Sequence, residues 1–335
     1  MRLHGLDIAR FVAFVGMVLV NFRLAAEVAD DGSFAAFFID LIEGRASALF
    51  VLLAGIGFSL GKPDIIVTYK RAAFLFVIGM IDMTIFSADI LHFYAMYFLV
   101  GVFAMRFEIK GLIYTGIGII FLWFLMLVYI DYDLGWDWDA LTYTDFWTPF
   151  GFIRNSLYNG WHPVAPWAAF FVFGMALGRL NLSGRTTQRR MAIGGGLLAL
   201  VFYTLSWMGQ SAIAELAEIF TLHSIPPGPI YVLYSTCTAM SAIGIILMLT
   251  PTLTRLKITL WLAAPGRQTL TLYVAHILLG MGTLEALGLL DGSLTNPEIL
   301  QISLAFCLLS ILYARLWSLF AKRGPLEWIM RRISG

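Results

Sequence analysis

Long runs of apolar residues, separated by short polar segments, occupy most of the chain. A helix of about 20 apolar residues can cross the hydrocarbon core of a bilayer, about 30 Å thick, because each residue adds about 1.5 Å. We expect ten membrane-spanning helices, over approximately 6–26, 34–60, 66–86, 90–106, 111–131, 163–181, 191–213, 230–250, 266–290 and 298–320. The pattern thus predicts an all-α, polytopic helical bundle that forms one domain over residues 1–335.

The composition of the chain agrees with a membrane protein. Of its 335 residues, 60% are hydrophobic and 13% are charged, and the mean hydropathy is +0.83. Soluble globular proteins carry about 25% charged residues. The formal net charge of +1 offers no cationic surface for phosphates, so we expect no nucleic-acid partner. Cys237 and Cys307 lack the spacing of a disulfide framework or a metal site, so we expect packed thiols and no metal.

Lys and Arg gather at alternate ends of the apolar runs. Because cytoplasmic loops retain positive charge, the N-terminus is expected inside. The inner segments then hold Arg2, Lys62, Lys70, Arg71, Arg106, Lys110, Arg179, Arg185, Arg189, Arg190, Arg255, Lys257, Lys322, Arg323, Arg331 and Arg332. The outer segments hold Glu27, Asp30, Asp31, Asp131, Asp133, Asp137, Asp139, Asp145, Glu215, Glu218, Asp291 and Glu298. The alternation predicts that both termini are cytoplasmic.

The first apolar run resembles a mature helix rather than a cleaved signal peptide. It is longer than the apolar part of a signal peptide, it contains Asp7 and Arg10, and it has no small-residue cleavage site. Asp7 and Arg10 lie three residues apart, so we expect them to form a local ion pair at the inner end of this helix.

Two polar segments lie outside the apolar runs. The longer one, residues 132–162, starts with YDLGWDWDALTYTDFW, which alternates too irregularly for a strand and is too polar for a crossing helix. Trp and Tyr favour the level of the lipid headgroups, so we expect an extracytoplasmic, interfacial loop. The last segment, residues 322–335, separates apolar from basic residues and predicts an amphipathic tail on the inner membrane surface.

Several polar side chains interrupt the apolar runs. The segment LIEGRASALFVLLAGIGFSLGK, residues 41–62, places Glu43 and Arg45 near mid-depth of the second run, too close in sequence to pair on one helix face. His276 lies near mid-depth of the ninth run, and Asn21 lies in the outer part of the first. A charge at membrane depth is costly unless it is paired or hydrated. We therefore expect these side chains to face the bundle interior or a water-filled cavity.

Two more histidines lie near the outer end of the bundle. His92 follows Asp89 at the outer end of the fourth run, and His162, within NGWHPVAPW, enters the sixth run at a similar level. Several titratable groups could therefore converge in the outer half. For each of them two interpretations stay open: a hydrogen bond that ties helices together, or a role in binding or catalysis.

Six stretches, distributed along nearly the whole length of the chain, are RLHGLDIARFVAFVGMVLVNF (2–22), LIEGRASALFVLLAGIGFSL (41–60), ADILHFYAMYFLVG (88–101), WHPVAPWAAFFVFGMALGRL (161–180), GRQTLTLYVAHILLG (266–280) and KRGPLEWIMRR (322–332). In this order they resemble the YeiB-like bacterial membrane proteins, which belong with heparan-alpha-glucosaminide N-acetyltransferase in a transmembrane acyltransferase superfamily. The resemblance implies a helical bundle in the bacterial cytoplasmic (inner) membrane, among membrane lipids.

The implied activity is the transfer of an acyl group from cytoplasmic acyl-CoA, the donor substrate, through a central cavity. The acceptor would lie outside and could be a sugar, a lipid or a small amine. The oligomeric state stays open, with a homo-oligomer among the alternatives.

Acyl transfer needs a base, a carboxylate that orients it, and a cation or amide that steadies the oxyanion. We assign His92 as the base and Glu43 as its orienting partner, with Arg45 and Asn21 as polar clamps for a carbonyl or phosphate group. Further candidate catalytic residues are His162 and His276. The remaining expected substrate-binding residues, of which the basic ones would attract the CoA phosphates, are Arg10, Lys70, Arg71, Tyr94 and Trp161.

One departure separates this chain from the heparan-type enzymes, which carry their catalytic histidine in the stretch after LVNF. Here that stretch reads RLAAEVADDGSFAAFF and contains no histidine, so His92 or His162 would have to replace it. Two other classes stay open. A lipid or solute transporter or flippase predicts two gates, inverted repeats and broken helices, of which the sequence shows no sign. A non-catalytic accessory subunit of a membrane complex is the other.

Overall fold

The computed structural model describes residues 3–212 and 214–335, apart from the side chains of residues 214–216. Arg2 and the side chain of Glu215, both used in the charge pattern, lie outside the described residues. The α-helices are α1 (His4–Ala25), α2 (Phe34–Ile42), α3 (Arg45–Leu60), α4 (Ile65–Asp82), α5 (Leu91–Ala104), α6 (Ile109–Tyr129), α7 (Pro149–Arg154), α8 (Val164–Gly178), α9 (Arg185–Ala212), α10 (Pro229–Arg255), α11 (Thr259–Gly266), α12 (Thr269–Ala275), α13 (Gly282–Ala286), α14 (Asn296–Phe320) and α15 (Pro325–Ser334).

The remaining described elements are short. They are the π-helices η1 (Asn155–Asn159) and η3 (His276–Met281), the 3₁₀-helix η2 (Ala214–Phe220), and the strands β1 (Trp136–Asp137) and β2 (Thr142–Tyr143). The chain divides into two compact units. Unit 1 comprises Met1–Phe50, Leu182–Ala192 and Ser241–Ile333, and unit 2 comprises Val51–Asn181, Ile193–Met240 and Ser334–Gly335.

Within the described residues, six helical segments are long and apolar enough to cross a membrane. They are α1, α6, α9, α10, the continuous stretch Thr269–Ala286, and α14. Helices α5 and α8 are apolar but shorter. These elements confirm the prediction of an all-helical, multi-pass membrane protein. The count of ten crossings and the cytoplasmic location of both termini stay predictions.

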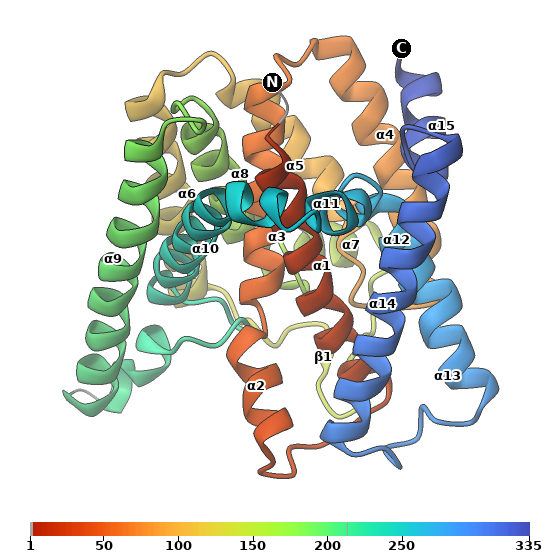
Figure 1. Ribbon diagram of the computed structural model, residues 1–335. Coiled ribbons are helices and arrows are strands. Elements are labelled where there is room, and N and C mark those ends of the chain that lie inside the picture. The colour runs from red at the N-terminus through yellow and green to blue at the C-terminus, as the bar shows by residue number, and fades with distance from the viewer. Residues whose placement is uncertain (1–2, 213) are drawn as a thin grey trace. The chain divides into compact units, whose positions relative to one another are not determined.

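Helix α1 is central to unit 1, where it packs against α11 and α14 (Figure 1). The helices approach closely because small residues lie between them. A Cβ added at Gly266 would lie 1.7 Å from the carbonyl oxygen of Asp7, so α11 touches the backbone of α1. The buried Asp7 carboxylate accepts a hydrogen bond from Arg10 at 2.9 Å, which confirms the expected local ion pair.

The apolar run 34–60 forms two helices instead of one. Helix α2 ends at Ile42, and Gly44 adopts a φ of +67°, a left-handed conformation that favours glycine and interrupts the helix. Helix α3 then begins at Arg45. The prediction of one continuous helix is therefore wrong, as is the statement that no helix is broken. Hydropathy did not reveal the break because glycine is common inside apolar helices.

Arg45 closes the end of α2. Its Nη1 donates hydrogen bonds to the carbonyl oxygens of Asp40 and Leu41, at 3.1 and 2.8 Å. A basic side chain at this position satisfies carbonyls that have no partner within the helix. The Asp40 carboxylate in turn pairs with the guanidinium of Arg23 from α1. The charged groups around the break thus have a structural role that the sequence analysis did not assign.

Unit 2 contains an equally close contact between helices. Residues 51–60 of α3 lie against α8, and glycines on both helices permit it. A Cβ at Gly55 would lie 1.9 Å from the carbonyl oxygen of Phe171, and one at Gly174 would lie 2.1 Å from that of Leu52. Helix α8 also packs against α5 and α6. These contacts fix the helix that follows His162.

A test of this contact is the substitution Gly55→Ala, which adds one methyl group. Because the new Cβ meets backbone, the helices must separate, and we expect the free energy of unfolding to fall by about 1–3 kcal/mol. The measurement is thermal unfolding of the purified protein in detergent. Gly118→Ala is the matched control, since nothing lies within 4 Å of its added Cβ in α6. Equal melting temperatures for the two variants would contradict the contact.

Candidate functional site

His92 lies in the first turn of α5, and the residues just before the helix orient it. The Asp89 carboxylate oxygen Oδ2 accepts the backbone N–H of Leu91 at 2.8 Å, and therefore caps the start of the helix. The same oxygen lies 3.3 Å from Nδ1 of His92. Asp89 and His92 are both fully buried. One carboxylate thus begins the helix and holds the imidazole ring.

The contact with Asp89 defines what His92 can do. A carboxylate oxygen accepts hydrogen bonds, so Nδ1 is the ring nitrogen that donates in this contact, and in that tautomer Nε2 is the acceptor. This Nε2 is buried and has no hydrogen-bond partner among the described residues. Most buried polar atoms do have a partner, and exceptions mark places where a ligand or water belongs. His92 therefore combines one ring nitrogen held by a carboxylate with a second that has no hydrogen-bond partner in the described chain.

Helix α4 approaches this pair closely. A Cβ at Gly79 would lie 2.2 Å from the backbone nitrogen of His92 and 2.9 Å from Oδ2 of Asp89. Asp82, at the end of the same helix, is 2% exposed, and its Oδ2 has no hydrogen-bond partner within the described part of the chain. Unit 2 therefore buries a second carboxyl group besides that of Asp89, and this one comes from α4. It was not among the residues predicted from the sequence.

His162 lies in the turn before α8, also in unit 2. Its carbonyl oxygen accepts a hydrogen bond from the hydroxyl of Tyr97 at 2.6 Å, and its ring lies edge-on to Trp167, with 4.5 Å between centroids. Phe93 neighbours both histidine rings, at 3.9 Å from His92 and 6.2 Å from His162. Burial lowers the pKa of His162, and repulsion from His92 lowers it further. His162 is thus held as a neutral imidazole.

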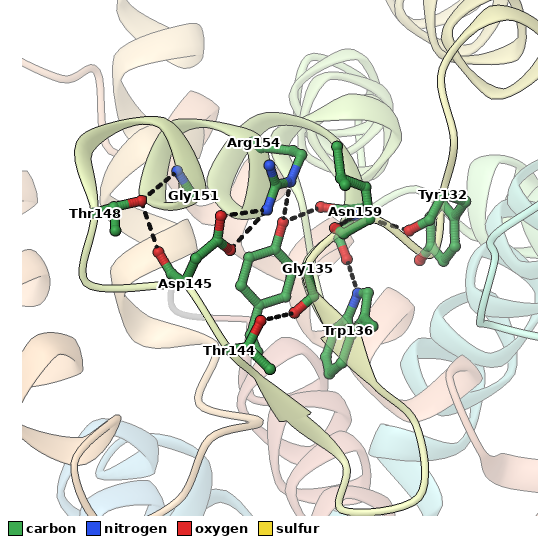
Figure 2. Close-up of polar contacts among 11 residues, drawn as sticks. Tyr132, Gly135, Trp136, Thr144, Asp145, Thr148, Gly151, Arg154 and Asn159 are labelled. Carbon is green, nitrogen blue, oxygen red and sulfur yellow. Dashed lines mark hydrogen bonds and ion pairs between the residues drawn. The ribbon is translucent and has the colours of Figure 1, made fainter.

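A hydrogen-bond network in the outer segment fixes the chain before His162 (Figure 2). Nη2 of Arg154 donates to both carboxylate oxygens of Asp145, at 2.6 and 2.8 Å, and Nε donates to the hydroxyl of Tyr143 at 2.7 Å. That hydroxyl donates to Oδ1 of Asn159 at 2.7 Å. These hydrogen bonds tie the hairpin of β1 and β2 to α7 and η1.

Asn159 is the centre of this network. Its Nδ2 donates to the carbonyl oxygens of Tyr132 and Leu134, at 2.7 and 2.9 Å, and its own carbonyl accepts the indole N–H of Trp136 at 2.6 Å. Asn159 is fully buried, and three residues separate it from Pro163 at the start of α8. The segment 132–162 is therefore tied together by hydrogen bonds up to Asn159, three residues before His162, and its interfacial location stays a prediction. The expectation that this segment forms no strand is wrong, because β1 and β2, of two residues each, pair as a short hairpin.

His276 has a different environment in unit 1. It begins η3, its Nδ1 donates to the carbonyl oxygen of Tyr273, and its Nε2 accepts from Nδ2 of Asn21 at 3.0 Å. Phe14 and Phe22 flank the ring, which is fully buried. Both ring nitrogens are satisfied by protein. The tie between α1 and η3 therefore supports the structural interpretation of His276.

The remaining predicted site residues are spread over both units. Glu43 is exposed at the helix break of unit 1, whereas His92 belongs to unit 2. The carboxylate that orients His92 is Asp89; a role for Glu43 stays a prediction. Lys70 is exposed on α4.

Three aromatic or basic candidates have defined partners in unit 2. Nε of Arg71 donates to the hydroxyl of Ser334 at 3.4 Å. The buried ring of Tyr94 lies 5.5 Å from that of Tyr97. Trp161 meets Trp136 edge-on, with 5.2 Å between ring centroids.

The contact between Asp89 and His92 could have been predicted from the sequence. Asp89 and His92 are three residues apart, the spacing that brings side chains together at the start of a helix. Their closeness is visible in the sequence, although Glu43 was predicted to orient His92. Asp82 left no such signal, since its place beside α5 depends on how α4 and α5 pack. Among the described residues, no three His, Cys, Asp or Glu side chains are grouped to hold a metal ion.

The fold and this site define a multi-pass helical membrane protein with a buried, carboxylate-oriented histidine. Residues 2–224 match the family "Heparan-alpha-glucosaminide N-acetyltransferase, catalytic", and the chain belongs to that family. Residues 177–335 match "Protein of unknown function (DUF418)". The chain is also 25% identical, over 384 residues, to the uncharacterized protein YeiB of Escherichia coli K12, covering 98% of this chain and 95% of YeiB. No solved structure matches.

These matches confirm the YeiB-like relationship that the six stretches predicted. His92 and His162 both lie within the part matched by the acetyltransferase family, residues 2–224. His276 lies outside it, in the part matched by the family of unknown function. The family boundaries therefore separate His92 and His162, each of which has a buried ring nitrogen without a hydrogen-bond partner in the described chain, from His276, whose two ring nitrogens both have partners.

The tie between Asn21 and His276 predicts a measurable coupling. Asn21→Ala leaves the buried Nε2 of His276 without its donor, which should lower the free energy of unfolding by about 1–3 kcal/mol. His276→Phe alone should also destabilise, because it orphans the amide. In the double variant neither orphan remains, so its loss should be smaller than the sum of the single losses. Additive losses in thermal unfolding would contradict the tie.

The environment of His162 predicts a pH effect on stability. The folded chain keeps this ring neutral, whereas the unfolded chain binds a proton near pH 6.5. Stability should therefore fall as the pH is lowered from 7 to 5, because the unfolded state takes up more protons. His162→Gln removes this contribution, so the drop in melting temperature should be smaller than in the wild type. His223→Gln, at an exposed histidine, should leave the drop unchanged. Identical drops in the wild type and His162→Gln would contradict the assignment.

Proposed function

We propose that this protein is a membrane-bound acyltransferase, which moves an acyl group from cytoplasmic acyl-CoA to an acceptor outside the cytoplasm. One observation carries the proposal: His92 is oriented by Asp89 and presents a buried Nε2 with no partner among the described residues. Membership of a family described by an acetyltransferase catalytic domain supports the reaction class. The name of that family also makes a glucosaminide the first acceptor to test.

His92 would act as the general base. The acceptor nitrogen or oxygen attacks the carbonyl carbon of the thioester, and Nε2 takes the proton that the acceptor loses. The carbon–sulfur bond then breaks, and the proton passes from His92 to the departing thiolate, so that CoA leaves as a free thiol. Asp89 holds the ring and stabilises the imidazolium that exists between the two proton transfers.

The polar and basic residues would serve binding. Arg45 and Asn21 are the proposed clamps for a carbonyl or phosphate group. Arg10, Lys70 and Arg71 would attract the anionic CoA phosphates at the cytoplasmic side. This assignment goes with the ten crossings that hydropathy favours and with the cytoplasmic termini that the alternating charges favour. It also goes with a place in the inner membrane of a bacterium, which the YeiB-like relationship suggests.

A transporter or flippase is the second candidate, because one observation favours it. The break between α2 and α3 at Gly44 gives unit 1 a discontinuous helix of the kind that lines substrate sites in transporters. The two candidates differ in their products. An acyltransferase releases free CoA thiol, whereas a transporter moves its solute across the membrane unchanged.

The proposal predicts that His92→Gln abolishes turnover. Nε2 has no hydrogen-bond partner among the described residues, so thermal stability should remain near that of the wild type, while the rate should fall about 10²–10⁴-fold. The measurement is thiol release from acetyl-CoA by the protein in nanodiscs, with glucosamine as acceptor. Asp89→Asn should also slow release, because the ring loses its orienting carboxylate. His223→Gln should retain full turnover, and unimpaired release in His92→Gln would exclude the proposed base.

The proposed role of the inner basic residues predicts that CoA affinity depends on salt. Raising the ionic strength from 0.01 to 0.15 M shortens the Debye length from about 30 to about 8 Å, so the affinity should fall. Isothermal titration with CoA measures this. Lys70→Gln/Arg71→Gln should weaken binding and flatten the salt dependence. Pantetheine, which lacks the phosphates, is the matched ligand control; the same salt dependence for both ligands would contradict the electrostatic role.

A further inference from the structure

The last helix, α15, has two unlike faces. It follows the candidate span α14 after only four residues, so it lies where that span leaves the membrane. Glu327, Met330 and Ser334 lie on the side that the protein covers or half-covers. On the opposite side of the helix, the side chains are exposed: 51% for Trp328, 38% for Ile329 and 54% for Ile333.

The covered face is anchored by Glu327. Its Oε1 accepts the backbone N–H groups of Leu270 and Thr271, at 2.8 and 3.2 Å, and its Oε2 accepts the hydroxyl of Thr271 at 2.6 Å. The hydroxyl oxygen of Thr271 accepts the backbone N–H of Leu326 at 3.0 Å. These bonds satisfy N–H groups at the start of α12 that the helix itself leaves unpaired. The tail therefore caps the helix that leads to His276.

The exposed face combines apolar and cationic groups. Arg332 lies between Trp328 and Ile333 on the helix surface, and its guanidinium stacks over the Trp328 ring at 5.2 Å. Arg331 is exposed beside it, and Lys322 and Arg323 are exposed just before the helix. The acidic residue of this helix, Glu327, points away from this face into its bonds with α12. The charged side chains of the exposed face are thus all positive.

We propose that the exposed face of α15 docks on the anionic lipid surface of the bilayer from which α14 emerges, and thereby holds Glu327 on the start of α12. Apolar side chains of such a helix enter the boundary between headgroups and acyl chains, while arginines reach the lipid phosphates. Continuity with α14 and the absence of negative charge on this face favour lipid over a protein partner. The proposal is independent of acyl transfer.

Hydrogen–deuterium exchange of the full-length protein tests this proposal. The protein is placed in nanodiscs of phosphatidylcholine alone and of phosphatidylcholine with phosphatidylglycerol, and exchange is followed in residues 325–334 and 269–275. Both segments should exchange more slowly with the anionic lipid. Each arginine near such a surface should contribute about fivefold to the docking equilibrium. High salt should weaken the protection.

Three variants make the outcome specific. Arg331→Gln/Arg332→Gln should remove the lipid-dependent protection of both segments. Arg189→Gln/Arg190→Gln, which removes the same charge from another exposed pair, should leave it intact. Glu327→Gln should release residues 269–275 while the tail still docks.

Three results would overturn the proposal. One is equal exchange in the two kinds of nanodisc. Another is protection that persists in Arg331→Gln/Arg332→Gln. The third is protection in detergent that rises with protein concentration, which would assign the exposed face to a second copy of the chain.

Discussion

The structure depends on one constraint: no water in the hydrocarbon core can satisfy a polar group, so each one must find its partner within the protein. Arg45 donates to the last carbonyls of α2, Asp89 accepts the first amide of α5, and Glu327 accepts the first amides of α12. In each case a charged side chain lies at a helix end, where backbone groups are unpaired. The charged residues inside the apolar runs are therefore partly a consequence of where helices stop.

The same constraint separates the histidines by role. His276 has a partner at each nitrogen, and its removal would leave the side-chain amide of Asn21 without this acceptor. His92 has a partner at Nδ1 and none at Nε2 within the described chain. Burying a nitrogen without a hydrogen-bond partner destabilises the folded state, because the nitrogen loses its hydrogen bond to water and gains none. Such a cost is expected where a substrate, rather than the protein, supplies the missing partner.

The sequence predicted the class of fold because membrane insertion leaves a long, simple signal in hydropathy. Local spacing also predicted the ion pair of Asp7 and Arg10, since both lie on one turn of one helix. It could not predict that Asn21 meets His276, because 255 residues separate them and only helix contacts bring them together. The break at Gly44 was not predicted for a related reason. Gly55 permits a close helix contact, whereas Gly44 adopts a left-handed conformation that ends a helix. The residue type alone does not distinguish these two roles of glycine.

Depth within an apolar run is consequently a poor guide to which charged residue does chemistry. Glu43 and Arg45 stood out because they interrupt such a run. Nη1 of Arg45, however, donates hydrogen bonds to backbone carbonyls of α2. Asp89 was less conspicuous, since it precedes a helix, where acidic residues are common caps. Its second contact, with Nδ1 of His92, gives that cap a chemical consequence. The atoms that a residue satisfies and those that it leaves open are therefore a better guide than depth, and they single out His92 in α5 as the residue to test.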